Sequence, residues 1–235
     1  MGFKERYDRT LSKVAACCAA CGRDPREVRV IAVSKTVGPD EVARAIEAGA
    51  HDFGENRPDQ LVEKQACFPQ QTWHFIGNIQ SRRIPDIVPR AALIHSLCQE
   101  HHLARIEAAA CAAGKVQDVL VEVNVSGEAS KDGLSIDETP DMIAACAACE
   151  HVRVRGLMTM APQGDLVVAR ACFERLAALR DELRAVMPPD RAAAFNELSM
   201  GMSEDWREGI AAGATMVRIG RALFSDAFMD APSQR

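Results

Sequence analysis

Short apolar segments alternate along the chain with longer stretches in which apolar residues recur every three or four positions. The short segments predict β-strands at 29–34, 50–54, 72–76, 91–96, 117–125, 153–160, 194–198 and 214–219. The longer stretches predict helices, chiefly at 39–48, 99–113, 138–149, 168–187 and 203–212. Because most of the strands are apolar on both faces, the pattern favours parallel strands covered by helices.

The same pattern predicts one more helix ahead of the first strand. Its apolar side, at steps of four and three residues, is formed by Phe3, Tyr7, Leu11, Val14 and Cys18. Eight strand-then-helix units predict an α/β fold, a single (β/α)8 TIM-like barrel with an extra N-terminal helix. A doubly wound open sheet is the alternative, but no Gly-x-Gly-x-x-Gly turn follows the first strand. Because no linker divides the chain, we interpret residues 1–235 as a single barrel domain.

Composition and charge narrow the class of protein. Of the 235 residues, 48% are hydrophobic and 26% are charged, which is typical of a globular protein with a full core. The net charge of −5 offers no basic surface for nucleic acid or an anionic membrane. No apolar stretch approaches the roughly 20 residues that cross a bilayer, and the charged start does not resemble a signal peptide. We therefore expect a soluble, cytoplasmic protein.

The nine cysteines are an odd number, scattered over predicted helices and strands, which favours reduced thiols over a disulfide framework. Two Cys-x-x-Cys pairs, Cys18 with Cys21 and Cys146 with Cys149, have Ala-Ala spacers instead of the knuckles typical of zinc sites. Cys146 and Cys149 also share an apolar helical face with Met142. We interpret them as core residues and expect no metal site.

Candidate chemistry gathers where the predicted strands end, because the βα loops of a barrel meet at one face. Lys35 follows the first apolar strand. A lysine that loses hydration there would have a lowered pKa and could form an imine. Taken alone, a lysine at such a position is more often an ordinary surface residue.

Two C-terminal segments carry the small residues, hydroxyls and arginine that suit a phosphate group, LSMGMSEDW (198–206) and MVRIG (216–220). Ser203 could contact a phosphate or cap the predicted helix that follows it. Gly220 could bind phosphate oxygen through its amide or make the last turn. An imine-forming lysine beside a phosphate site indicates a bound aldehyde phosphate, for which pyridoxal 5'-phosphate (PLP) is the candidate.

Two further polar residues fall in predicted strands. Arg218 is costly in a barrel strand unless it is paired, so it requires a bound anion, a ring nitrogen or a buried carboxylate. The candidate carboxylates are Glu55, Glu122 and Glu197. His74 stands in an otherwise apolar strand, where a histidine is more often a hydrogen-bonded core residue than a catalyst.

Seven segments together resemble the pyridoxal phosphate homeostasis protein family. They are AVSKT (32–36), FGEN (53–56), WHFIG with Gln80, VNVSGEASKDGL (123–134), RGLMTM (155–160), LSMGMSEDW (198–206) and GATMVRIG (213–220). They occur in the order and spacing of the family and span residues 30–224. The resemblance implies a fold-type III barrel, similar to the N-terminal domain of alanine racemase, that holds PLP as a Schiff base on Lys35.

The resemblance also implies roles for six other residues. The phosphate would be contacted by Ser199, Ser203 and Gly220; Asn56 and Met158 would lie beside the ring; and Arg218 would approach the ring nitrogen. The Arg218 guanidinium stays charged, so it would disfavour a proton on that nitrogen and weaken the ring as an electron sink.

Some positions of the chain depart from the family or have a looser assignment. Lys131 corresponds to a family lysine linked to a secondary cofactor site. Arg57 replaces a common aromatic residue, Arg82 and Arg83 stand where an Asn-Lys arrangement is more usual, and Arg221 replaces a small hydroxyl residue. A phosphate contact from that hydroxyl is therefore not expected, although Arg221 could contribute charge.

Whether such a protein turns over a substrate depends on its acid/base groups. A racemase needs two of them, on opposite faces of the substrate, and in alanine racemases the second is a tyrosine from the partner subunit. The only tyrosine here is Tyr7, in the first predicted helix. We therefore expect no catalytic residues and a protein that buffers or delivers PLP in PLP homeostasis.

Two enzymatic alternatives remain open at this point. One is a minimal PLP-dependent amino-acid racemase or lyase that uses His74 or a cysteine as the missing base. The other is a class I aldolase, in which a barrel lysine forms an imine with a sugar phosphate. As partners we expect PLP and transient contact with PLP-dependent apoenzymes, and we expect a monomer rather than an obligate oligomer.

Overall fold

The eight predicted strands form a closed barrel of parallel strands in the order of the sequence. The computed structural model describes residues 2–128, 131–225 and 228. The strands are β1 Arg29–Val33, β2 Asp52–Glu55, β3 Thr72–Phe75, β4 Leu93–Leu97, β5 Gln117–Glu122, β6 Val152–Met158, β7 Glu197–Met202 and β8 Met216–Ile219. The barrel closes through β1 and β8, where Ile31 lies beside Arg218. The predicted (β/α)8 TIM-like barrel is confirmed.

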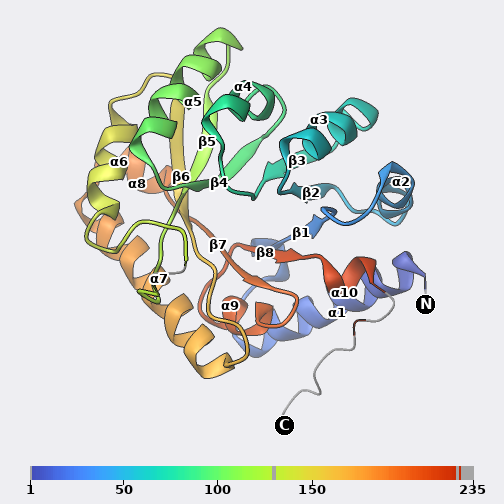
Figure 1. Cartoon of the computed structure of the whole chain (residues 1–235). Helices are drawn as coiled ribbons and strands as arrows, with labels where there is room; N and C mark the ends of the chain where they lie inside the picture. The colour runs from blue at the N-terminus through green and yellow to red at the C-terminus, as the bar shows by residue number, and fades with distance from the viewer. Residues whose placement is uncertain (1, 129–130, 226–227, 229–235) are drawn as a thin grey trace.

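Helices lie between the strands and surround the barrel (Figure 1). They are α2 Pro39–Glu47, α3 Pro58–Cys67, α4 Ile84–Ile87, α5 Glu100–Ala112, α6 Thr139–Ala147, α7 Leu166–Val186, α8 Pro189–Ala194, α9 Trp206–Ala211 and α10 Arg221–Phe224, with 3-10 turns η1 Pro25–Glu27 and η2 Ser81–Arg83. The predicted extra helix is α1 Phe3–Ala20, which packs against α9 and α10 beside the end of the barrel sequence (Figure 1).

The largest differences from the predicted pattern lie around β7. The strand was predicted at 194–198 but runs from Glu197 to Met202, because the preceding residues form α8 with Pro189 in its first turn. The helix predicted at 203–212 begins only at Trp206. The Asp205 carboxylate accepts a hydrogen bond from the Met202 amide (2.6 Å) and closes the turn between strand and helix.

The core has two parts. A small apolar cluster fills the barrel interior, formed by Ile31, Leu93, Leu120, Met158 and Met216. A much larger one lies between the strands and the helices and includes Cys18 and Cys146, with Cys149 partly buried against it, as predicted. Cys21, which was also predicted to be a core residue, is exposed, because it follows the end of α1. Because the interior cluster is small, polar side chains share the inside of the barrel, and they are described below.

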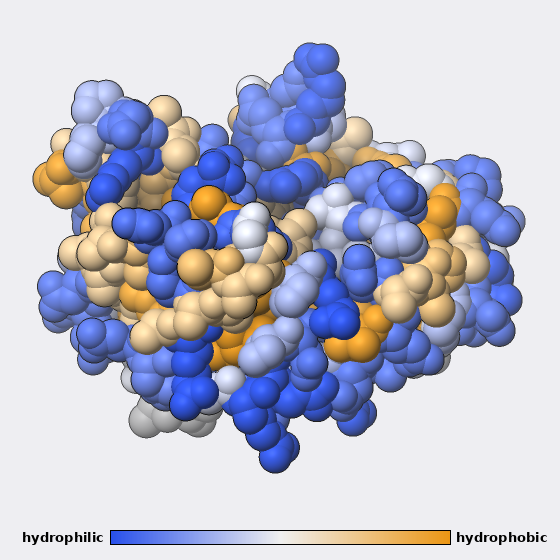
Figure 2. All heavy atoms as spheres, turned by 90° about the horizontal axis from the view of Figure 1, so that it is seen from above, coloured by the Kyte–Doolittle hydropathy of each residue, from blue (hydrophilic) through white to orange (hydrophobic). Residues whose placement is uncertain are grey.

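The surface seen from above is mainly hydrophilic, with hydrophobic residues in patches between charged side chains (Figure 2). Among the described residues, no helix combines the length and the apolar character needed to cross a bilayer. Within the same residues, no cluster of three or more His, Cys, Asp or Glu side chains could hold a metal ion.

Candidate functional site

The barrel brings four of the predicted site residues to one rim, at the carboxyl ends of the strands. Lys35 lies two residues after β1, Asn56 directly follows β2, Ser203 directly follows β7, and Gly220 directly follows β8. A Cβ atom on Gly220 would lie 3.2 Å from the Val33 carbonyl oxygen, so the ends of β8 and β1 are closely packed. This packing brings the Gly220 amide close to the segment that carries Lys35.

Lys35 itself is exposed in the turn after β1. The loss of hydration that the sequence suggested for its amine is therefore not seen in this structure. The exposure has a different consequence, because an amine at the barrel rim is accessible to an aldehyde from solution. The start of this turn is fixed to β2, because the Ser34 amide donates to the Gly54 carbonyl oxygen (3.1 Å).

The buried lysine of this region is Lys64 in α3, which the sequence analysis did not single out. Its side chain is fully buried, and its Nζ donates to the Ser34 carbonyl oxygen (2.8 Å) and to Glu55 Oε1 (2.6 Å). The Ser34 hydroxyl also donates to Glu55 Oε1 (2.6 Å). The ion pair thus fixes the residue that precedes Lys35. The one sequence signal was the position of Lys64 three residues after the buried Leu61, on the same helical face.

The loop after β2 is fixed by a close backbone contact with the loop after β3. A Cβ atom on Gly77 would lie only 2.1 Å from the Asn56 carbonyl oxygen, so only glycine fits at this position. The Ser96 hydroxyl donates to the Gly77 carbonyl oxygen (2.6 Å) and extends the contact to β4. Asn56 is therefore held at the rim by its main chain.

The segment around Ser203 connects the loops after β7 and β8. Its hydroxyl accepts a hydrogen bond from the Ala222 amide (3.4 Å), and helix α9 does not begin until Trp206. Ser203 therefore does not cap that helix, and the residue before the helix is Asp205. Arg221 forms an ion pair with Glu204 (3.0 Å), in which both side chains are about half exposed.

Arg218 lies inside the barrel, and burial lowers its pKa to about 10, against the opposing effect of Asp205 and Glu122. Its guanidinium donates to Ser199 Oγ (2.6 Å) and to the Thr159 carbonyl oxygen (3.0 Å). None of the three carboxylates considered from the sequence forms a described salt bridge with it. Glu197 pairs with Arg29, and Glu55 pairs with Lys64.

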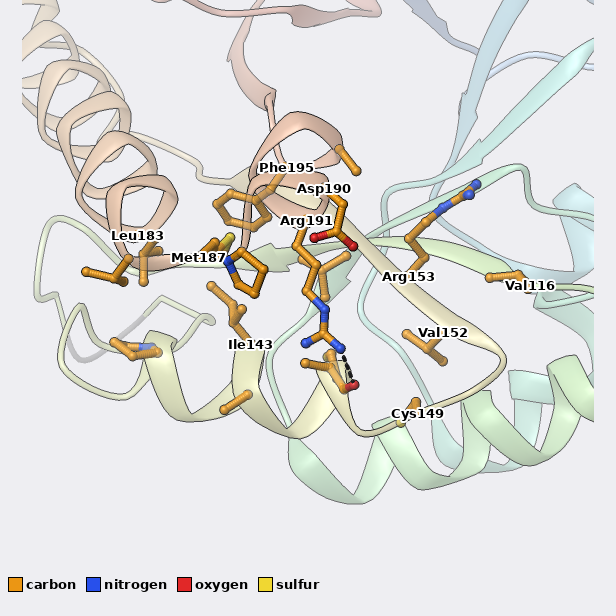
Figure 3. Close-up of a pocket in the computed structure, with 18 of the residues that line it drawn as sticks. Val116, Ile143, Cys149, Val152, Arg153, Leu183, Met187, Asp190, Arg191 and Phe195 are labelled. Atoms are coloured by element: carbon orange, nitrogen blue, oxygen red, sulfur yellow. Dashed lines mark hydrogen bonds between the residues drawn. The ribbon is translucent and has the colours of Figure 1, made fainter.

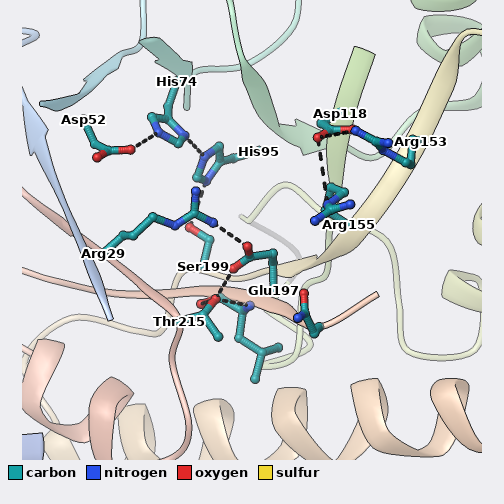
Figure 4. A network of polar contacts seen from close by, with 12 residues as sticks. Arg29, Asp52, His74, His95, Asp118, Arg153, Arg155, Glu197, Ser199 and Thr215 are labelled. Carbon is teal, nitrogen blue, oxygen red and sulfur yellow. Dashed lines mark hydrogen bonds and ion pairs between the residues drawn. The ribbon is translucent and has the colours of Figure 1, made fainter. Parts of the chain in front are cut away.

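Ser199 and His74 belong to one line of hydrogen bonds inside the barrel (Figure 4). Ser199 Oγ lies 2.9 Å from His95 Nδ1, His95 Nε2 lies 3.0 Å from His74 Nδ1, and His74 Nε2 lies 3.0 Å from Asp52 Oδ1. His74 is thus a hydrogen-bonded core residue, as the sequence indicated. His95 was missed, because its partners come from β3 and β7 and no local pattern marks them.

Two other predicted residues lie near the carboxyl ends of β5 and β6. Met158 is buried at the end of β6, beside Glu122 at the end of β5. Burial raises the pKa of Glu122 to about 7, although Arg218 opposes the shift. Lys131 donates to the Met160 carbonyl oxygen (3.2 Å), and this bond joins the loop after β5 to the loop after β6. Glu122 is a second titratable group of this region that the sequence did not mark as a site residue.

A pocket of about 620 Å³ lies elsewhere, on the outside of the barrel (Figure 3). It is lined mainly by apolar residues of α6, α7 and α8 and by the start of β6, including Ile143, Val152, Leu183 and Phe195. None of the predicted site residues lines it. The pocket therefore provides no support for the chemistry inferred at the rim.

Comparison with known proteins identifies the family. The family model for the N-terminal domain of alanine racemase matches residues 14–227. The pyridoxal phosphate homeostasis protein of Aquifex aeolicus is 34% identical over 229 residues, which cover 96% of this chain and 99% of that protein. The chain belongs to the pyridoxal phosphate homeostasis protein family. The family's Escherichia coli K12 protein is 35% identical over 218 residues, covering 90% of this chain and 91% of the relative.

Solved structures agree with membership of this family. PipY from Synechococcus elongatus, described with PLP bound, has a TM-score of 0.78 and 30% identity and covers 90% of this chain and 99% of its own. An uncharacterised protein from Bifidobacterium adolescentis has a TM-score of 0.88 and 31% identity, with 94% of each chain covered. A D-threonine aldolase from Filomicrobium marinum, at 15% identity and a TM-score of 0.75, shares the fold. It covers 99% of this chain but 63% of the aldolase chain.

Proposed function

We propose that this protein binds PLP at the carboxyl end of the barrel as a Schiff base on Lys35 and serves PLP homeostasis by buffering or delivering the cofactor. The observation that carries the proposal is the exposed Lys35 amine at the rim, with the Arg218 cation held inside the same barrel. Membership of a family named for PLP, with PLP described in PipY, supports the same conclusion.

The contacts that we propose for PLP follow the rim. The phosphate would be held near Ser203 and Gly220, where the loops after β7 and β8 are joined by the bond between the Ala222 amide and Ser203. The ring would lie towards Asn56 and Met158, and its nitrogen towards Arg218. PLP supplies an aldehyde that condenses reversibly with an amine. The protein's part is to present Lys35 and to hold the phosphate and the ring.

We propose that the protein has no turnover of its own, because the tyrosine that serves as the second acid/base group of alanine racemases has no counterpart among the described residues of the rim. Tyr7, the only tyrosine of the sequence, is buried in α1. It lines a surface pocket together with Asp52, the first residue of β2, so it lies at the amino end of the strands, opposite Lys35. The two ring nitrogens of His74 are both hydrogen-bonded inside the barrel, which leaves neither available as a base.

An accessible site at the rim also suits exchange with other proteins. A Schiff base at an exposed lysine can be transferred to an amine or to a PLP-dependent apoenzyme without opening a lid. We propose that such contacts are transient, that the protein acts as a monomer and that it works in the cytoplasm.

The test combines a visible absorption spectrum with chemical trapping. PLP added to the purified protein should give a yellow band that borohydride removes, and peptide mass mapping should find the pyridoxyl adduct on Lys35. Lys131→Ala should keep the band and the adduct, whereas Lys35→Ala should lose both. Absence of a band and of an adduct on wild-type protein would overturn the proposal. Chiral analysis after overnight incubation with alanine, serine or lysine should detect no turnover, and robust racemisation would instead support the enzymatic alternative.

A further inference from the structure

A continuous line of hydrogen bonds crosses the barrel interior, and the proposed PLP contacts account for only one end of it. The line runs from Asp52 at the start of β2 through His74 and His95 to Ser199 (Figure 4). It continues from Ser199 to Arg218. Because β4 and β7 are not neighbours in the barrel, the bond between His95 and Ser199 links opposite parts of its wall. His74, His95 and Ser199 are each 1% exposed or less, so water does not compete for these bonds.

The charges at the two ends fix the direction of the bonds. Arg218 can only donate. At the other end, burial raises the pKa of Asp52, but the hydrogen bond from His74 and the nearby basic side chains together outweigh burial, and the pKa is lowered overall. Asp52 is therefore an ionised group that only accepts. With both histidines neutral, every hydrogen bond between these two residues then points from Arg218 towards Asp52.

The two histidines fit this direction only when both are neutral. Burial lowers the pKa of His74, and burial together with the charges of Arg218 and Arg29 lowers that of His95 well below its usual value. The other charged groups near the pair are Asp52 and Glu197, which act on His74 in the opposite sense. Each ring then carries its hydrogen on Nε2, and His95 Nδ1 is left to accept from the Ser199 hydroxyl.

We propose that Asp52, His74, His95 and Ser199 form one directed hydrogen-bond chain that positions the Arg218 guanidinium, and that Ser199 is a positioning residue for Arg218 instead of a ligand of the cofactor phosphate. The Ser199 hydroxyl donates its only hydrogen to His95, and its oxygen accepts from Arg218. No hydrogen remains on Ser199 for a phosphate oxygen. The PLP readout described below rests on the proposed function, whereas the histidine readout does not.

The first test uses the wild-type protein without PLP. Nitrogen-15 spectra of labelled histidine at neutral pH should show His74 and His95 as neutral rings that carry their hydrogen on Nε2. His74→Gln and His95→Gln assign the signals, and the buried His102 lies outside the chain and serves as the internal comparison. A protonated ring, or a hydrogen on His95 Nδ1, would reverse the chain, free the Ser199 hydroxyl and overturn the proposal.

The second test separates the two roles of Ser199. The affinity of Ser199→Ala for inorganic phosphate should stay within about twofold of that of wild type. Loss of a hydrogen bond to the phosphate would instead lower the affinity by about tenfold or more. In the PLP-loaded protein, Ser199→Ala and His95→Gln should both shift the pH midpoint of the visible band, in the same direction, by about one unit. Ser199→Thr, which keeps a hydroxyl, should restore the wild-type midpoint, and His102→Gln should leave it unchanged.

Two results would contradict this second expectation. One is a loss of phosphate affinity of about tenfold in Ser199→Ala with an unshifted midpoint, which would make Ser199 a phosphate ligand. The other is a shift in Ser199→Ala with none in His95→Gln, which would remove His95 from the chain. If wild-type protein binds no PLP, the proposed function fails, and the histidine spectra still decide the direction of the chain.

Discussion

At the residue scale, an ion pair buried between strand β2 and helix α3 is an unusual feature of this protein. Lys64 and Glu55 are fully buried, and Glu55 Oε2 has no hydrogen-bond partner among the described residues. A charge in such a place depends on its partner, because water cannot replace it. The ion pair therefore stabilises the end of β1 only as long as both residues are present.

The expected result of breaking this pair is a large loss of stability. Lys64→Ala should lower the free energy of unfolding by about 3 to 5 kcal/mol, because it leaves the Glu55 carboxylate buried without compensation. Urea denaturation measures the change. Arg44→Ala removes one partner of an exposed pair with Glu41 and should cost less than about 1 kcal/mol. The double variant Glu55→Gln, Lys64→Met should recover part of the loss. Equal effects of Lys64→Ala and Arg44→Ala would show that the buried pair has no such role.

Glu122 gives a prediction about pH. Burial raises its pKa to about 7 in the folded protein, whereas in the unfolded chain the pKa is about 4.3. Between these values the folded state holds a proton that the unfolded state has released, so this group lowers the stability as the pH rises from about 4.3 to 7. Glu122→Gln removes the effect. The free energy of unfolding of the variant minus that of wild type should increase by up to about 3 kcal/mol between pH 5 and pH 8. Urea denaturation at the two pH values tests this, and parallel behaviour of the two proteins would contradict it.

At the scale of elements, the site depends on close contacts between the loops that follow neighbouring strands. Gly77→Ala would place a methyl group 2.1 Å from the Asn56 carbonyl oxygen, so the loops after β2 and β3 must separate. We expect a loss of about 3 kcal/mol, at the upper end for overpacking, because main chain has to move. Gly2→Ala adds a methyl group where no atom lies within 4 Å, and because Gly2 is the N-cap of α1 it should cost no more than about 1 kcal/mol. Thermal denaturation of both variants tests the contact, and a neutral Gly77→Ala would show that the two loops are not fixed to one another.

The strands and most of the helices could be predicted because their signals are local. Apolar runs mark β1 to β6 and β8, while β7 was displaced because helix α8 extends to Ala194, where the strand was expected to begin. The rim residues followed from the strand ends. The histidine chain could not be predicted, because His95 acquires its role from Ser199, 104 residues away in sequence. The burial of Lys64 was missed for a related reason, since its partner Glu55 belongs to another element.

At the scale of the whole molecule, binding of PLP should stabilise the folded state. Free PLP at about 100 times its dissociation constant adds about 2.7 kcal/mol, which raises the melting temperature of a chain of this size by about 5 to 10 °C. Thermal denaturation with and without PLP measures the shift. Lys131→Ala should keep most of it, and Lys35→Ala should lose most of it.

The contribution of the Schiff base can be separated from that of the phosphate with pyridoxine 5'-phosphate, which has the same phosphate and ring but no aldehyde. The analogue should give the same small shift of the melting temperature in wild type and in Lys35→Ala, because without an aldehyde it cannot form an imine with either protein. If PLP stabilised the two proteins equally, Lys35 would not be the attachment point. If the analogue stabilised wild type as strongly as PLP does, binding would come from the phosphate and ring contacts alone. Because an imine on an exposed lysine is open to exchange with other amines, only a stabilisation that depends on Lys35 is consistent with a protein that both holds PLP and releases it.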